Sequence, residues 1–399
     1  MNHAFLKVFK NKIPDTLLRF ILIGSTLFSN KLVLILIAYF FNDIQYNVFN
    51  KAYYTASIII LFGTLGFDFA INRINVAIRT VTLGVIINIT ASLSVLYLLN
   101  EPFDNYSQVV AIFFYSLFSS LGAIYTFQHL FHGRVKNYVI LMLLSGVLHL
   151  MIIPFVLLLE YDIYLLLPIV AAVWFLVGLR GFIFHNKESG EKLVSLYKLG
   201  ITTFIINSAV SLALVADKYF VNHYFPIETA NAYTFSWGLI VPMLYIGNVI
   251  ERLIYSSTSH QPVAVFKKVL FIIFLLISLY SIVLIAVVNL FPAVLPGSIN
   301  VSQLVQIISF MIWGYAIFVI LNFPVNGYLF KFAETSKQKI IAGAYLTVAF
   351  LFIILWWLMG DTIKVMDYKL LLLLIWAFIF SLLVSKSVFT FFPIFNSKS

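Results

Sequence analysis

The sequence predicts an all-α, polytopic membrane protein with about twelve transmembrane helices and no soluble domain of any size. Hydrophobic residues make up 62% of the 399 residues and charged residues only 10%, whereas globular domains carry about 25% charged residues. A water-soluble protein could not hide this much apolar surface, because part of it would have to face solvent. Apolar stretches of about 20 residues, the length that crosses a bilayer, recur along the whole chain.

About twelve apolar stretches, each close to the length of a membrane-spanning helix, are separated by short polar breaks. The expected spans are residues 16–41, 53–71, 81–99, 109–131, 138–159, 164–184, 199–221, 232–250, 269–290, 304–330, 340–358 and 370–391. Because the breaks are short, all of the non-helical backbone can lie at the two membrane surfaces, where water satisfies its polar groups.

Positive charge is distributed unevenly between alternate breaks. With the N-terminus in the cytoplasm, 20 of the 25 lysine and arginine residues fall on the cytoplasmic side, as the positive-inside rule requires. We therefore expect both termini in the cytoplasm, and the net charge of +10 reports topology and not a nucleic-acid partner. The first apolar run is too long for a signal-peptide core, so we expect a retained first helix.

The chain divides near its midpoint. The most charged break, residues 185–198, leaves six of the expected spans on each side, which suggests a duplicated unit. We expect an N-terminal six-helix lobe at 1–190 and a C-terminal six-helix lobe at 191–399. Two short similarities between the halves support the duplication, YFFN at 39–42 with YFVN at 219–222 and AY at 52–53 with AY at 232–233.

Three lysines are candidates for contact with an anionic substrate. Lys31 lies inside the first expected helix, where a charge costs about 2.5–3.5 kcal/mol on insertion scales, so we expect it to face a cavity. The alternative is that Lys31 snorkels to the interface or pairs with an acid. Lys51 and Lys218 lie near the outer ends of the second and seventh helices and could join it in a cationic cluster; alone, Lys51 would be an ordinary flanking lysine.

Asp217 and Lys218 are neighbours, about one turn inside the outer end of the seventh expected helix. Because adjacent residues on a helix point about 100° apart, we expect the two side chains to have different partners. Asp217 could bind a coupling proton or sodium ion. The alternative is a structural ion pair near the interface.

Acid–base pairs stand at the cytoplasmic ends of two corresponding helices. Asp68 and Arg73 end the second helix, and Glu251 and Arg252 end the eighth. They could gate a cavity by making and breaking contacts during alternating access. The alternative is that they anchor the helix ends in the interface.

The chain lacks the usual signs of an enzyme. It has no cysteine, so a disulfide or thiolate metal site is excluded. No nucleophile motif, phosphate-binding glycine loop or dinucleotide fingerprint occurs, and His129 and His132 have no third metal ligand nearby in sequence. We expect a transporter with no catalytic residues, no metal and no cofactor.

Two stretches of the sequence carry a family resemblance. Residues 46–73 (YNVFNKAYYTASIIILFGTLGFDFAINR) and 212–237 (LALVADKYFVNHYFPIETANAYTFSW) resemble the second helix and the seventh-to-eighth helix segment of the Wzx-type O-antigen flippases. These belong to the multidrug/oligosaccharidyl-lipid/polysaccharide (MOP) exporter superfamily. Length, helix count and the six-plus-six division extend the resemblance over the whole chain. The residues at recurring positions are Gly63, Gly66, Asp68, Arg73, Ala216, Asp217, Lys218 and Tyr233, while Ala52 and Ala232 replace frequent glycines.

The resemblance implies a MATE-like fold, two six-helix lobes in a V around a cavity that opens alternately to each side of a bacterial inner membrane. The implied substrate is an undecaprenyl-pyrophosphate-linked oligosaccharide, moved to the outer leaflet for O-antigen or other surface polysaccharide. Lys31, Lys51 and Lys218 would hold the pyrophosphate. Sugar rings would stack on aromatic side chains, for which the candidates are Tyr39, Tyr53, Tyr219, Tyr233 and Trp237. The alternative for many of these side chains is an aromatic belt at the membrane interface.

The resemblance also implies partners. Membrane lipids surround the protein, and a proton or sodium ion would drive transport through Asp217, Asp68 or Glu251. A polysaccharide polymerase and a chain-length regulator would act on the exported unit.

Two other functions remain open from the sequence. The first is a small-molecule or drug exporter of the same fold, which the lysine at mid-membrane disfavours for cationic drugs because like charges repel. The second is an O-antigen polymerase. Such enzymes place catalytic residues on long outer loops, whereas the largest outer loop here, residues 291–302, carries no charge.

Overall fold

A computed structural model describes residues 32–71, 74, 76–98, 103, 105–131, 135–158, 163–182, 193–256, 262–292, 295–296, 299–332, 340–348, 350–351, 354 and 367–396. Every regular element in these residues is a helix, which confirms the all-α class. Three of the helices hold a stretch that is long and apolar enough to cross a membrane, Ile78–Leu98, Tyr106–Thr126 and Val301–Phe323. Shorter apolar helices accompany them.

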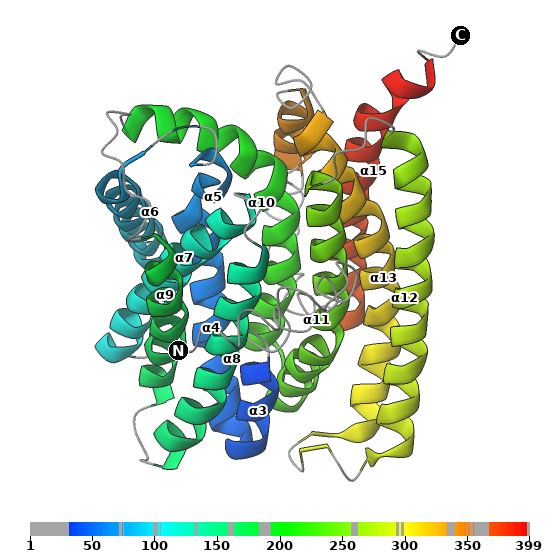
Figure 1. The fold of residues 1–399 in the computed structure, drawn as a ribbon. Coiled ribbons are helices and arrows are strands. Elements are labelled where there is room, and N and C mark those ends of the chain that lie inside the picture. The colour runs from blue at the N-terminus through cyan, green and yellow to red at the C-terminus, as the bar shows by residue number, and fades with distance from the viewer. Residues whose placement is uncertain are drawn as a thin grey trace, which may run out of the picture.

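The first half of the chain forms one group of helices (Figure 1). Helix α7 packs against both α4 and α9, and α6 and α8 flank this core. The elements of this group are α3 (Leu32–Phe40), α4 (Asp43–Thr64), α5 (Phe67–Ala70), α6 (Ile78–Leu98), α7 (Tyr106–Phe131), α8 (Val135–Leu158), the 3₁₀ turn η1 (Ile163–Leu165) and α9 (Leu166–Phe182).

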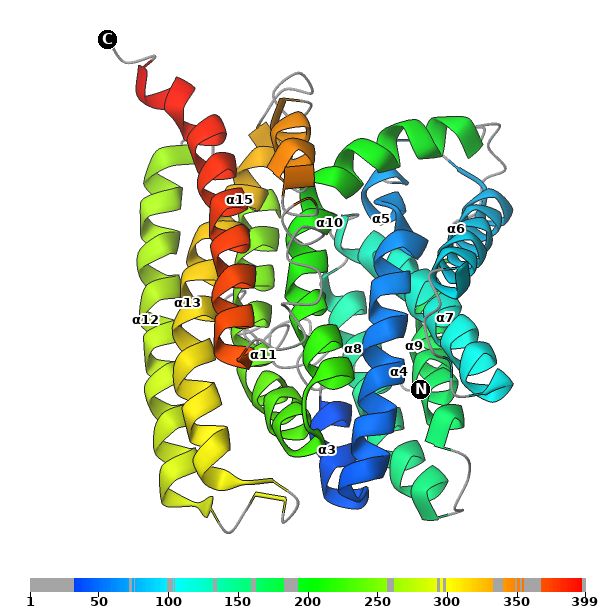
Figure 2. The same cartoon turned by 180° about the vertical axis from the view of Figure 1, so that it is seen from behind.

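The second half forms another group around the pair α11 and α13, and α12 and α15 pack on α13. Figure 2 shows this group from behind, with α12 at the edge of the molecule farthest from α6. Its helices are α10 (Leu193–Tyr224), α11 (Ile227–Ser256), α12 (Pro262–Leu290), α13 (Val301–Phe332) and α15 (Tyr368–Asn396), with further helical backbone at 340–348.

Helix α10 joins the two groups. It begins above α5 and α6, runs across that end of the molecule and then turns down between the groups (Figure 1). Along this course it contacts α4, α5 and α6 of the first half and α11 and α15 of the second. The predicted lobe boundary at 190–191 therefore falls just before the helix that connects the groups.

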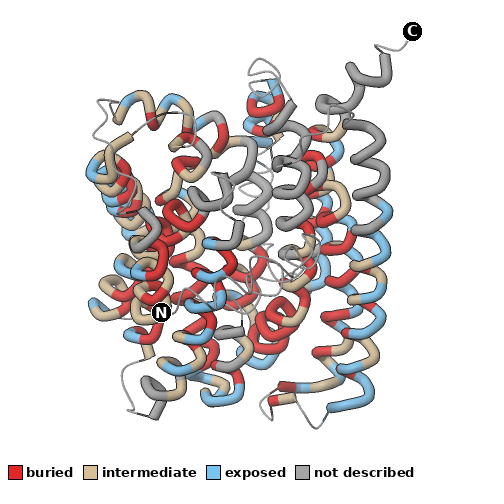
Figure 3. The backbone as a smooth tube through the Cα atoms, in the orientation of Figure 1, coloured by how far each residue is buried: buried red, intermediate tan, exposed pale blue. Residues whose placement is uncertain are grey.

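Large apolar side chains cover the outside of the bundle. Phe271, Phe274 and Ile282 on α12 are more than half exposed, and so are Tyr97 and Leu98 on α6. Figure 3 shows exposed residues along the outer edge of α12 and buried residues inside the bundle. A contiguous apolar exterior of this kind is typical of a surface in contact with lipid.

Helix α4 starts earlier than the sequence predicted. The expected span began at residue 53, but a capping box starts the helix at Asp43. The Asn42 side chain accepts from Gln45 N at 2.9 Å, and the Gln45 side chain accepts from Asn42 N at 3.2 Å. The polar residues that follow resemble a loop in sequence, yet Tyr46, Asn47 and Asn50 are buried against other helices.

The same helix ends inside the expected span. Leu65 and Gly66 both have left-handed backbone, with φ of 39° and 70°, and they separate α4 from α5. Gly66 is needed for a second reason, because a Cβ on it would lie 2.4 Å from the carbonyl oxygen of Gly200 in α10. A Cβ on Gly200 would likewise lie 2.6 Å from Leu65 O. The two halves thus meet backbone to backbone at this break.

Candidate functional site

The deepest charged group in the described part of the chain lies on α10. Asp217 is 2% exposed and Lys218 is fully buried. Because α10 continues to Tyr224, the pair lies about 10 Å, or two helical turns, inside the end of the helix. The prediction of about one turn was too shallow, since the expected span ended at residue 221.

The two residues form an ion pair with each other. Lys218 Nζ lies 2.8 Å from Asp217 Oδ1 and 3.0 Å from Oδ2. The backbone N–H of Lys218 also donates to Asp217 Oδ1 at 2.8 Å. The prediction that adjacent side chains would have different partners is wrong, because the long, flexible lysine stem bends back over the neighbouring carboxylate. The structure shows an ion pair, as the alternative interpretation had it, while the binding of a coupling ion by Asp217 stays a prediction.

Three aromatic side chains enclose the pair. The Tyr233 hydroxyl donates to Asp217 Oδ2 at 2.5 Å, and the Tyr315 hydroxyl donates to the same oxygen at 3.3 Å. Lys218 Nζ donates to the Tyr315 hydroxyl at 2.5 Å and lies 3.7 Å from the centre of the Trp237 ring. A cation over an indole face in a desolvated site is stabilised by about 2 kcal/mol. We call these five residues the ion-pair cluster.

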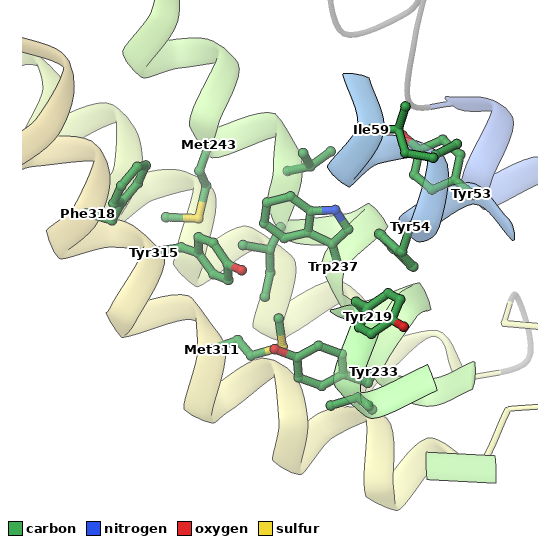
Figure 4. Close-up of a cluster of buried hydrophobic side chains, with 14 of the residues drawn as sticks. Tyr53, Tyr54, Ile59, Tyr219, Tyr233, Trp237, Met243, Met311, Tyr315 and Phe318 are labelled. Atoms are coloured by element: carbon green, nitrogen blue, oxygen red, sulfur yellow. The ribbon is translucent and has the colours of Figure 1, made fainter. Parts of the chain in front are cut away.

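Three helices supply the ion-pair cluster. Asp217 and Lys218 come from α10, Tyr233 and Trp237 from α11, and Tyr315 from α13. Figure 4 shows Trp237 between Tyr315 on one side and Tyr54 of α4 on the other. The cluster therefore sits in the second half of the chain, at the face that this half turns toward α4.

The hydrogen bonds offset part of the desolvation free energy that burying two charges costs. Removing an ion from water costs several kcal/mol even after relaxation, and the loss is recovered only when the pair has good geometry and its remaining polar atoms are satisfied. Here the ammonium has the carboxylate, a phenol and an indole face, and the carboxylate has two phenols. Removing either charge would leave the other buried without compensation.

A second set of polar residues holds α10 against α11. Asn222 Nδ2 donates to Lys218 O at 2.8 Å and to Thr234 Oγ1 at 3.0 Å. Tyr54 of α4 lies close to both Thr234 and Asp217. Asn222, Thr234 and Tyr54 are all buried. The surroundings of the ion-pair cluster thus include a polar contact with the first half of the chain.

The other predicted site residues lie in different surroundings. Tyr219 is buried and stacks on His223, with ring centres 4.1 Å apart. Tyr39 is about half exposed and meets Phe235 edge-on at 6.3 Å. Lys51 is half-buried on α4, and Asp68 is half-buried on α5.

Several predicted residues cannot be placed at the site. Lys31 and Arg73 lie outside the described residues. The backbone of Glu251 and Arg252 belongs to α11, but their side chains are not among those described. Of the predicted candidates, the structure therefore brings together Asp217, Lys218, Tyr233 and Trp237.

Two buried groups were missed by the sequence analysis. Tyr315 was not singled out, although a lone phenol in the apolar middle of a helix needs a polar partner when it is buried. Lys386 was not singled out either, yet it is only 1% exposed, and its Nζ donates to Asn322 Oδ1 at 3.2 Å. Helix α15 turns this residue toward α13.

In the described residues, no three His, Cys, Asp or Glu side chains gather as metal ligands would. Comparisons with known proteins add no relatives: no family model matches the chain, and neither a curated protein nor a solved structure matches it. The resemblance to Wzx-type flippases, drawn from the sequence, therefore stays a prediction.

Proposed function

We propose that this protein is a multi-pass transporter of a bacterial inner membrane that moves an undecaprenyl-pyrophosphate-linked oligosaccharide to the outer leaflet by alternating access. In this proposal about twelve helices form two lobes, and both termini are cytoplasmic. The observation that carries it is the fully buried Lys218–Asp217 pair inside an apolar helical bundle. Ionisable residues at such depth usually mark a substrate or ion pathway.

The pair suggests how an anion and a proton could exchange at one site. Asp217 holds Lys218 through both carboxylate oxygens, so a pyrophosphate must displace the carboxylate to reach the ammonium. Protonation of Asp217 removes the competing negative charge and frees Lys218 for phosphate oxygens. Loss of that proton re-forms the pair and expels the anion. Asp217 is thus the coupling group in this proposal, and Lys31 and Lys51 complete the anion site.

The aromatic side chains and the helix ends have supporting roles in the proposal. Tyr233, Tyr219 and Tyr39 offer ring faces to sugars. Asp68 with Arg73 and Glu251 with Arg252 gate the cytoplasmic mouth. A polymerase and a chain-length regulator would then receive the exported unit.

One observation favours a second candidate, a small-molecule exporter. Two aromatic rings and a carboxylate surround one cation in the ion-pair cluster. Such a site also suits an organic cation, which would replace the Lys218 ammonium over the Trp237 ring. The sequence-based objection to cationic drugs is weaker here, because Asp217 neutralises Lys218.

A deletion strain of the native host separates these functions. Surface polysaccharide is analysed by gel, and the lipid-linked repeat unit is located across the inner membrane with a periplasmic probe. The flippase proposal predicts loss of surface glycan with complete units on the cytoplasmic leaflet. Units that reach the outer leaflet without being joined would indicate a polymerase. Unchanged glycan together with increased drug sensitivity would indicate the exporter.

A further inference from the structure

One face of α4 is polar and buried. Asp43, Tyr46, Asn47, Asn50 and Tyr54 recur at spacings of one, three and four residues and so share one face of the helix. The last four are each less than 5% exposed. From Tyr46 to Tyr54 this polar stripe covers about 12 Å along the helix axis. We call these five residues the α4 polar stripe.

The two ends of the α4 polar stripe lie against the second half of the chain. At one end, Asn231 of α11 donates to the Asp43 carbonyl oxygen at 3.0 Å. At the other end, Tyr54 lies close to Asp217 and Thr234. Tyr53, at the margin of the stripe, packs instead on α7, with its ring centre 5.8 Å from that of Tyr115. The stripe therefore runs from the end of the bundle that holds the α10–α11 turn inward to the ion-pair cluster.

The stripe has unused hydrogen-bonding capacity. Within the described residues, no hydrogen-bond partner meets the amide nitrogens of Asn47 and Asn50 or the amide oxygen of Asn50 with normal geometry. Asp43 Oδ1 and the Asn231 side-chain oxygen are in the same condition. In the same part of the chain, the hydroxyls of Tyr46 and Tyr54 have only loose contacts with Asn50 and Thr234, which fall short of that geometry. Leaving a buried polar atom unsatisfied costs about 1–3 kcal/mol. Native proteins usually avoid that cost with bound water, which makes about three hydrogen bonds to such groups.

We propose that the α4 polar stripe holds a file of water molecules that carries protons between the α10–α11 end of the bundle and Asp217. The entrance is open to solvent, because Asn42 and Gln45 beside Asp43 are exposed. A proton from solvent passes along the file, because each water accepts a proton on its oxygen and gives one of its own O–H protons to the next oxygen. It ends on Asp217 Oδ2, and the carboxylate becomes a neutral carboxylic acid.

The groups around Asp217 determine what the arriving proton does. They are Lys218 on α10, Tyr233 on α11, Tyr315 on α13 and Tyr54 on α4. Only Lys218 carries a charge at neutral pH, so neutralising Asp217 leaves the ammonium without its counter-charge. This inference rests on the proposed transport function, in which a freed Lys218 binds the substrate anion.

Water along the stripe can be detected without any substrate. In radiolytic hydroxyl labelling of the full-length protein in lipid nanodiscs, buried side chains beside bound water are oxidised quickly. Tyr125 of α7 is the matched control, because it is 2% exposed, like Tyr54, and its hydroxyl lies 3.4 Å from Thr82 Oγ1 of α6 and not on the stripe. We expect Tyr46 and Tyr54 to be labelled faster than Tyr125. Labelling no faster than that of Tyr125 would overturn the proposal.

Proton transfer is measured by infrared difference spectroscopy after a pH step, with the Asp217 carboxyl band assigned by its loss in Asp217→Asn. Asn50→Leu keeps the branched shape of the side chain but removes the polar atoms in the middle of the stripe. We expect protonation of Asp217 to slow about tenfold in this variant and to be unchanged in Tyr125→Phe. Should Asn50→Leu not accumulate, Tyr54→Phe tests the same step. An unchanged rate would refute proton conduction even if the water is present.

The two proposals can fail separately. The labelling and infrared tests need no lipid-linked oligosaccharide, so a positive result would stand if another substrate were transported. Conversely, loss of surface glycan in the deletion strain would still support the flippase proposal if labelling showed no water along the α4 polar stripe.

Discussion

Lys218→Met is the substitution whose effect follows most directly from the structure. It keeps an unbranched apolar side chain in place of the lysine stem and removes the ammonium. Asp217 then keeps the backbone N–H of residue 218 and the phenols of Tyr233 and Tyr315 but has no counter-charge in its buried site. Breaking a buried pair from one side costs about 3–5 kcal/mol. Loss of the cation over the Trp237 ring acts in the same direction.

The double variant Asp217→Asn/Lys218→Met separates the lost charge from lost packing. It replaces both charges with neutral groups of similar size, which is often close to neutral for stability. We therefore expect the double variant to recover most of the 3–5 kcal/mol lost by Lys218→Met. The assay is denaturant unfolding of the purified protein in mild detergent, followed by helical circular dichroism and analysed as a double-mutant cycle.

Small and additive losses of stability would contradict a buried, coupled pair. This outcome would be a cost of less than about 1 kcal/mol for each of Lys218→Met and Asp217→Asn, with effects that add in the double variant. Transport is expected to be lost in the single and double variants alike, so recovered stability without recovered transport would assign a functional role to the charges.

Three further predictions concern other parts of the chain. Tyr315→Phe should lower the free energy of unfolding by about 1.5–3 kcal/mol in the same assay, because its hydroxyl bonds to both charges; an unchanged midpoint would contradict those contacts. Gly66→Ala should lower the free energy of unfolding by more than the about 1–2 kcal/mol that a non-glycine residue costs in the left-handed conformation, because the added Cβ would also collide with the Gly200 carbonyl oxygen. In the control Gly343→Ala the added Cβ has no heavy atom from elsewhere in the described chain within 4 Å, so this variant should be neutral or stabilising. Equal effects of the two variants on stability would exclude the close contact between Gly66 and Gly200. Lys31→Gln should impair export of surface glycan at a matched protein level in the membrane, and wild-type export would remove this residue from the substrate path.

The helical class and the position of the charged pair were predictable because both are local properties of the sequence. Continuous apolar runs of about 20 residues fit spanning helices, whereas the strands of a membrane barrel are shorter and alternate between apolar and polar residues. Asp217 and Lys218 stand out because charges inside an apolar run are costly. The pairing between them was not predictable from helix geometry alone, since it depends on a side-chain conformation that Trp237 and Tyr315 stabilise from other helices.

Features that depend on contacts distant in sequence were missed for the same reason. The Tyr315 hydroxyl meets Lys218 across a separation of 97 residues, and no pattern along α13 indicates that partner. Lys386 has the sequence context of a flanking lysine, and only the packing of α15 on α13 buries it. The early start of α4 is different, because Asn42 and Gln45 have the spacing of a capping box and could have been recognised.

The most direct test of the central claim is transfer of a lipid-linked oligosaccharide by the purified protein. An undecaprenyl-pyrophosphate-linked oligosaccharide is placed in the inner leaflet of proteoliposomes, and its arrival in the outer leaflet is measured with a membrane-impermeant glycosidase. We predict transfer above that of protein-free liposomes, with dependence on a pH gradient, and none with the folded Asp217→Asn/Lys218→Met variant. Equal transfer by this variant, or none by the folded wild-type protein, would contradict the account.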